Sequence, residues 1–136
     1  MCTPRITLQI QSETDNLNSV EKFLQDLKKR CDISEEFYFA IWAAVSEAVI
    51  NAIVHGNKND KRKIVSIDVS HEKSICMFSI EDQGEGFDYR NIKFSTFSDN
   101  LIKIGGRGIL LMKKLSRHLR FSKNGRCVKL FFYTKE

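Results

Sequence analysis

One stretch of the chain combines a carboxylate and an amide on an otherwise apolar helix. Residues 46–56 read Ser-Glu-Ala-Val-Ile-Asn-Ala-Ile-Val-His-Gly, and Glu47, Asn51 and His55 follow one another at intervals of four. This spacing places all three side chains on one face of a helix, with a small angular drift. A carboxylate within an apolar helix is costly unless it meets a partner, a metal or a ligand. The stretch therefore predicts a helix that borders a functional site.

Two glycine clusters are the next candidates for chemistry. Their members are Gly84, Gly86, Gly105, Gly106 and Gly108. The first cluster follows Asp82 at the end of an expected strand, and glycine there lets the backbone approach a ligand closely. The second precedes an expected helix, where free N–H groups and the helix dipole favour phosphate. Either cluster alone is equally compatible with an ordinary turn, and neither matches the P-loop or the dinucleotide-binding pattern.

The elements that must position these residues follow from hydrophobic periodicity. Strands are expected over 5–11, 65–69, 75–80, 120–122 and 126–133, and helices over 17–30, from a cap at Asp32 or Ser34 to Gly56, and after Gly105. Residues 89–104 have weak periodicity and are interpreted as a long mobile segment. The order predicts an α+β fold, in which a mixed, mostly antiparallel sheet carries helices on one face of a two-layer sandwich. A length of 136 residues fits one domain, 1–136.

Composition narrows the function class only slightly. The formal net charge of +5 suits anionic partners, but it is too small to indicate nucleic acid by itself. The four cysteines are scattered without a CxxC pair, so zinc is not expected, and Cys76 and Cys127 are interpreted as buried thiols. We see no run of about 18 apolar residues that suggests a membrane span and no signal peptide, so the cytoplasm is the expected location. Trp42 and the later Phe94 and Phe97 are interpreted as packing residues.

In combination the motifs resemble those of the GHKL ATPase superfamily, which includes gyrase, histidine-kinase and mismatch-repair ATPase domains. The segment 46–56 looks like the N box of this superfamily, 82–86 like its first glycine box, and 105–108 like the second. The chain is most similar to the compact anti-sigma-factor serine kinases, over essentially its whole length. The resemblance implies the Bergerat fold and ATP binding.

The resemblance also implies a role for each matching residue. Asn51 resembles the ligand of Mg²⁺, which prefers oxygen donors and keeps several waters. Glu47 resembles the general base that accepts the proton of the attacking hydroxyl. Asp82 resembles the acceptor of the adenine amino group, with Gly84 and Gly86 beside the base.

The residues from 89 to 108 resemble the ATP lid, and the second glycine box would offer N–H groups to the phosphates. A cation that reaches the γ-phosphate is expected in the kinase relatives, and two residues compete for this role. Lys103 lies nearest to the expected position, but lysine lacks the bidentate fork of arginine. Arg107, inside the glycine box, is the alternative.

The implied function is a Mg²⁺- and ATP-dependent anti-sigma factor and serine protein kinase. Its partners would be a sigma factor and an anti-anti-sigma protein of the STAS type that is phosphorylated on serine, and a homodimer is expected. Neither direct nucleic-acid binding nor a membrane is expected. Two alternatives stay open: a nucleotide-gated binding switch without phosphotransfer, and a detached histidine-kinase ATPase domain. A helical segment with an acceptor histidine is missing from the sequence, which argues against the second alternative.

Overall fold

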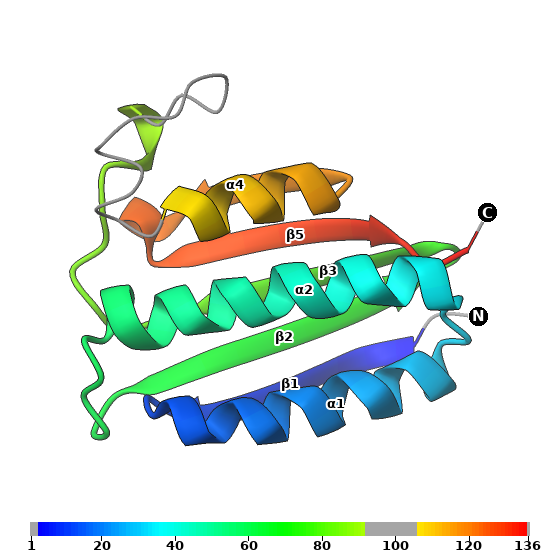
Figure 1. Cartoon of the computed structure of the whole chain (residues 1–136), viewed down its shortest axis with the longest axis horizontal. Coiled ribbons are helices and arrows are strands. Elements are labelled where there is room, and N and C mark those ends of the chain that lie inside the picture. Colours follow the sequence, from blue (N-terminus) through cyan, green and yellow to red (C-terminus); the bar gives the residue numbers. More distant parts are fainter. Residues whose placement is uncertain (1–2, 92–105, 136) are drawn as a thin grey trace.

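The chain builds two layers, with helices on one face of an antiparallel sheet (Figure 1). The computed structural model describes residues 3–91 and 106–135. Within them the main elements, in chain order, are β1 (Thr3–Gln11), α1 (Leu17–Arg30), α2 (Glu35–Asn51), β2 (Ile64–Glu72), β3 (Ile75–Glu81), α4 (Gly106–Leu115), β4 (His118–Ser122) and β5 (Cys127–Tyr133). The expected fold class and the sequence of elements are confirmed.

The five described strands lie in the order β1-β2-β3-β5-β4, and each neighbouring pair is antiparallel. The register joins Ile67 to Ile80 and Phe78 to Leu130, so that apolar side chains from adjacent strands share one face. Strict alternation along β2 makes every second side chain buried, as the period of a strand requires. The sheet therefore has one apolar face for the helices and one polar face.

Helix α2 occupies the centre of the helical layer, between α1 and α4 (Figure 1). The inner residues of α2 pack on the sheet, and the amphipathic helix α1 contributes its apolar face to the same core. The fully or nearly fully buried members of these two helices are Val20, Leu24, Leu27, Ile41, Ala44, Val45, Ala48 and Val49. The polar stripe of α2, formed by Glu47 and Asn51, is therefore flanked by buried apolar residues. The C-terminal end of α2 lies beside the end of β3 and the start of β5 (Figure 1).

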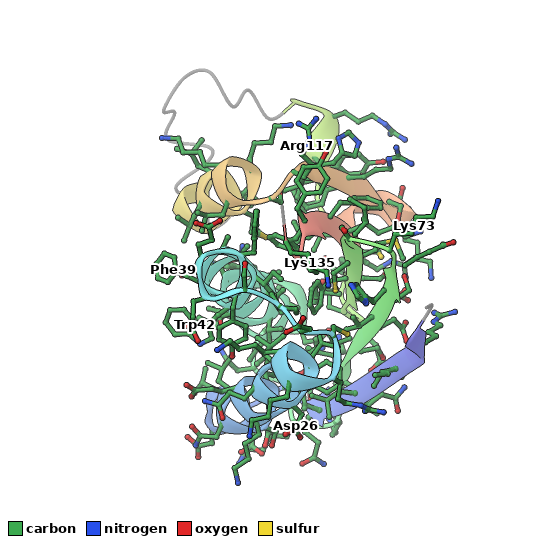
Figure 2. The ribbon with its side chains drawn as sticks, turned by 90° about the vertical axis from the view of Figure 1, so that its right-hand side faces the viewer. Asp26, Phe39, Trp42, Lys73, Arg117 and Lys135 are labelled. Atoms are coloured by element: carbon green, nitrogen blue, oxygen red, sulfur yellow. The ribbon has the colours of Figure 1, made fainter. Side chains whose placement is uncertain are left out.

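The long apolar helix requires two corrections. The helical stretch from Glu35 to Gly56 is 22 residues long and contains an 18-residue window with a mean hydropathy of 1.7, so by length and composition it could cross a membrane, contrary to the sequence-based expectation; the core helix of a protein can have the same composition. The residues of α2 that pack on the sheet account for much of this apolar character. Trp42 was expected to be a packing residue, but it is 38% exposed and lies beside Phe39, which is 60% exposed. Figure 2 shows both rings pointing away from the sheet.

Two other expectations have different outcomes. Cys76 and Cys127 are buried free thiols, as expected. The segment 89–104 was interpreted as mobile; its first residues form a short 3-10 turn, Tyr89–Asn91, and the rest, with Phe94 and Phe97, lies outside the described residues.

Candidate functional site

A cavity of about 250 Å³ opens where the end of α2, the start of α4, the end of β3 and the start of β5 meet. These element ends lie together at the left of Figure 1. The walls are mostly apolar, with a few polar groups among them, which is typical of a small-molecule site. The apolar walls include Ala48, Ile80, Phe87, Ile109, Met112, Phe121 and Val128, and the polar side chains are Asn51, His55, Asp82 and Arg126.

The polar stripe of α2 meets the first turn of α4. A Cβ atom at Gly108 would lie 2.8 Å from Glu47 Oε2 and 3.3 Å from Asn51 Nδ2, so a larger residue would collide with the stripe. The Nδ2 atom of Asn51 is buried and has no hydrogen-bond partner in the described part of the chain. A buried amide without a partner is costly, and a bound ligand would remove that cost.

The last turn of this helix is wider than the rest. Residues Ala52–Gly56 (η2) form a π-helical turn, and the N–H of Asn57 bonds to the carbonyl of Ala52 at 2.8 Å. Such turns are rare and occur frequently at functional sites. The turn brings His55 and Gly56 to the cavity; His55 is exposed.

Asp82 is held in place from several sides. Its N–H donates to the carbonyl of Arg126 at 2.9 Å, and its Oδ1 accepts from the N–H of Gly84 at 2.8 Å. A Cβ atom at Gly56 would lie only 2.3 Å from Asp82 Oδ2, so the helix end must be glycine. Burial is the largest influence and raises the pKa of the Asp82 carboxyl, although the bond from Gly84 and the charge of Arg126 oppose it.

The two glycines after Asp82 allow neighbouring backbone segments to come into close contact. A Cβ atom at Gly84 would lie 2.0 Å from the carbonyl oxygen of Gly56. Gly86 has φ +84°, and its Cβ would lie 2.1 Å from the carbonyl oxygen of Asn124. Both positions therefore require glycine on steric grounds, and Gly86 also on conformational grounds.

Asn57 is not among the site residues expected from the sequence. The side chain is 1% exposed. Its Nδ2 donates to Ser12 Oγ at 2.7 Å and to the carbonyl of Ile64 at 3.1 Å, and its Oδ1 accepts from the N–H of Gln83 at 2.7 Å. Asn57 thus ties the loop after Asp82 to the end of β1 and the start of β2.

The aromatic wall and the arginine of the cavity were also missed. Phe87 and Phe121 meet edge to face at a ring distance of 5.2 Å, and both line the cavity. Arg126 lies next to the Asn-Gly turn of η4 (Lys123–Gly125), where the sequence indicated only the start of the strand 126–133. No local pattern marks these residues, because their positions beside Asp82 depend on the pairing of β3 with β5.

The residues predicted from sequence are brought together as far as the structure describes them. Asn51, Asp82 and Gly86 line one cavity, Gly84 supports Asp82, and Gly108 abuts Glu47. Gly106 begins α4 and Arg107 follows within its first turn, while Lys103 and Gly105 lie outside the described residues. In the parts of the chain that the structure describes, no group of three His, Cys, Asp or Glu side chains is suited to hold a metal.

The chain has an antiparallel sheet covered by helices, and a polar helix stripe meets two glycine segments beside it. These features define a GHKL-type ATPase domain. The chain belongs to the histidine kinase-like ATPase domain family, whose profile matches residues 10–132.

Several characterised proteins are similar to the chain. The anti-sigma F factor of Geobacillus stearothermophilus is 33% identical over 79 residues, which are 58% of this chain and 54% of the relative. The anti-sigma F factor of Clostridium perfringens strain SM101 is 39% identical over 70 residues, 52% of this chain and 47% of the relative. The serine-protein kinase RsbW of Listeria innocua is 24% identical over 117 residues, 82% of this chain and 74% of the relative. The chain thus spans about half the length of the anti-sigma F factors that it matches.

Proposed function

We propose that the chain is an ATP-dependent serine protein kinase that also binds a sigma factor and phosphorylates a STAS-type anti-anti-sigma protein. The observation that supports this most is the meeting of the α2 stripe, the Asp82 loop and the start of α4 at one cavity. The class of partner follows the relatives, which are called anti-sigma F factors and a serine-protein kinase. We further propose a homodimer that acts in the cytoplasm without direct contact to nucleic acid or membrane.

The Asp82 end of the cavity suits a nucleobase. The N–H of Gly84 donates to Oδ1 of Asp82, which leaves Oδ2 as an acceptor for the adenine amino group. Phe87 and Phe121 provide an apolar wall for the base. A site built to accept a hydrogen bond in apolar surroundings discriminates strongly, because an unmatched group stays buried.

The Asn51 end suits the phosphates and their metal. The buried Nδ2 of Asn51, which lacks an acceptor among the described residues, would donate to a phosphate oxygen, and Oδ1 of the same amide would be the protein oxygen that a magnesium ion takes. Magnesium, when bound, would neutralise charge on the phosphates. The N–H groups at the start of α4, at Gly106 and Gly108, would hold phosphate oxygens, and Lys103 or Arg107 would add a positive charge at the γ-phosphate.

Glu47 is the proposed general base. It lies one turn before Asn51 on the same face of α2, so its carboxylate is placed next to the phosphate end of the cavity and away from Asp82. From there it would accept the proton of a substrate serine hydroxyl as the phosphoryl group is transferred. Positioning and charge neutralisation supply most of the catalysis in such a transfer.

The test compares Glu47→Gln with the wild type and with Glu36→Gln, a matched change of an exposed glutamate on the same helix. Purified protein, radiolabelled ATP, Mg²⁺ and a candidate anti-anti-sigma protein give the transfer rate, and calorimetry gives the affinity for ADP. Glu47→Gln should keep the affinity within a few fold and lower the rate by roughly 10²–10⁴-fold. Glu36→Gln should change neither.

Two outcomes would contradict the proposal in different ways. Transfer at the wild-type rate by Glu47→Gln would remove Glu47 as the base. A wild-type protein that binds ATP but phosphorylates no anti-anti-sigma protein from its own cell would be a nucleotide-gated binding switch instead.

A further inference from the structure

The loop that carries Asp82 is held by backbone hydrogen bonds at three successive residues. The N–H of Asp82 donates to the carbonyl of Arg126 at 2.9 Å, and the N–H of Gly84 donates to Oδ1 of Asp82 at 2.8 Å. Between them, the N–H of Gln83 donates to Oδ1 of Asn57 at 2.7 Å. The bond to Asn57 therefore joins this loop to the residue that directly follows the π-helical turn at the end of α2.

Asn57, Gln83 and Ile64 form a closed ring of hydrogen bonds. Nδ2 of Asn57 donates to the carbonyl of Ile64 at 3.1 Å, and the N–H of Ile64 donates to Oε1 of Gln83 at 2.7 Å. The bond from the N–H of Gln83 to Asn57 closes the ring, so that each of the three residues donates once and accepts once. A fully satisfied network of this kind is rigid, because a shift of one member breaks bonds to both of the others.

Asn57 is the buried member of this ring. The residue is 1% exposed, whereas Gln83 is exposed. Nδ2 of Asn57 also donates to Oγ of Ser12 at 2.7 Å, so both of its hydrogens are used within the protein. The amide group is thus fixed in one orientation, with its donors towards Ser12 and Ile64 and its acceptor towards the loop of Asp82.

We propose that Asn57 is a positioning residue for base recognition, which holds the Asp82 carboxylate where it accepts from the exocyclic amino group of adenine. The inference rests on the nucleotide site proposed above and adds to it a residue that does not line the cavity. Groups that recognise a ligand must be held within about 0.5 Å of the productive geometry by side chains that are themselves fixed. Asn57 meets this condition, because it fixes the backbone of the residue next to Asp82 and is itself fully bonded.

The experiment compares ADP with the diphosphate of purine riboside, which lacks only the exocyclic amino group. Calorimetry gives both affinities, and their ratio measures the contact to Asp82 separately from the rest of nucleotide binding. The wild type should prefer ADP by roughly 5- to 150-fold, the range that one buried hydrogen bond gives. Asn57→Ala should bring this ratio to within about twofold of no preference, because a misplaced carboxylate loses the contact.

Two variants separate positioning from a general loss of stability. Ser12→Ala is the matched control, because Ser12 is 0% exposed and bonds to Asn57, but on the donor side of the amide. This change should lower the thermal stability and leave the ratio of affinities unchanged. Asn57→Asp keeps an oxygen for the N–H of Gln83 and gives up both donors, so it should retain the preference for ADP at a lower stability.

The outcomes distinguish this inference from the function on which it rests. If Asn57→Ala is folded and keeps the wild-type ratio, or if Ser12→Ala lowers the ratio as much, the positioning role is refuted and the ATP site stands. If thermal unfolding shows that Asn57→Ala is not folded, Gln83→Ala opens the ring at its exposed member and decides in the same way. If the wild type binds both diphosphates equally, the proposed contact between Asp82 and the base fails, and this inference fails with it.

Discussion

Replacing Asp82 by asparagine changes one atom at the base end of the cavity. The Oδ1 of Asp82 accepts from the N–H of Gly84 at 2.8 Å, and asparagine can keep this bond with its own carbonyl oxygen. Its Nδ2 then takes the place of Oδ2. A donor would face the amino group of adenine, where the wild type offers an acceptor. The fold should be retained, because the two side chains have nearly the same shape.

The expected loss follows from this mismatch. A buried hydrogen-bonding group left without its partner costs about 1–3 kcal/mol, which corresponds to a loss of roughly 5- to 150-fold in affinity. A loss within this range is expected, because two donors would oppose each other at a half-buried position. Glu85→Gln is the matched control, since this exposed carboxylate lies in the same loop but does not line the cavity.

Calorimetric titration with ADP over a range of pH gives a second readout. Burial raises the pKa of the Asp82 carboxyl, so protonation should weaken ADP binding at a higher pH than for an exposed aspartate. Asp82→Asn should lack this dependence. Equal ADP affinity for Asp82→Asn and the wild type would show that Asp82 does not contact the base.

Two further predictions concern groups outside the nucleotide contacts. Asn57→Ala should lower the free energy of unfolding by about 1–3 kcal/mol, because the N–H of Gln83 and the other partners of Asn57 lose a buried hydrogen bond. Denaturant unfolding measures this loss. A change as small as that caused by the exposed control Asn18→Ala would contradict the prediction. His71 is buried, and burial together with the charges of Lys135 and the N-terminus lowers its pKa below 6.5. Because the unfolded chain then binds the proton more readily, stability should fall as the pH drops through 6.5 towards the lowered pKa. His71→Gln should flatten this part of the profile and the exposed His118→Gln should not, so an unchanged profile in His71→Gln would exclude His71 as its source.

Much of the fold could be predicted because its signals are local. Alternation in 65–69 and helical spacing in 17–30 depend on neighbours a few residues apart; the helix forms where expected, and the strand forms there and extends over Ile64–Glu72. The outer face of α2 was harder to predict, because a helix that is apolar almost all round does not show which side meets the sheet. For this reason the expectation that Trp42 packs was wrong, and the residue is exposed.

The residues of the site also fall into two groups, those that a local sequence pattern marks and those that it does not. Glu47, Asn51 and the glycines after Asp82 could be recognised in the sequence, because the periodicity of a helix and the backbone freedom of glycine are properties of short segments. In contrast, the packing of the folded chain brings Arg126 and Phe121 to the cavity and lets Asn57 hold the loop after Asp82. These contacts join residues far apart in the chain through the order of strands in the sheet, and strand order is set by the packing of the whole core.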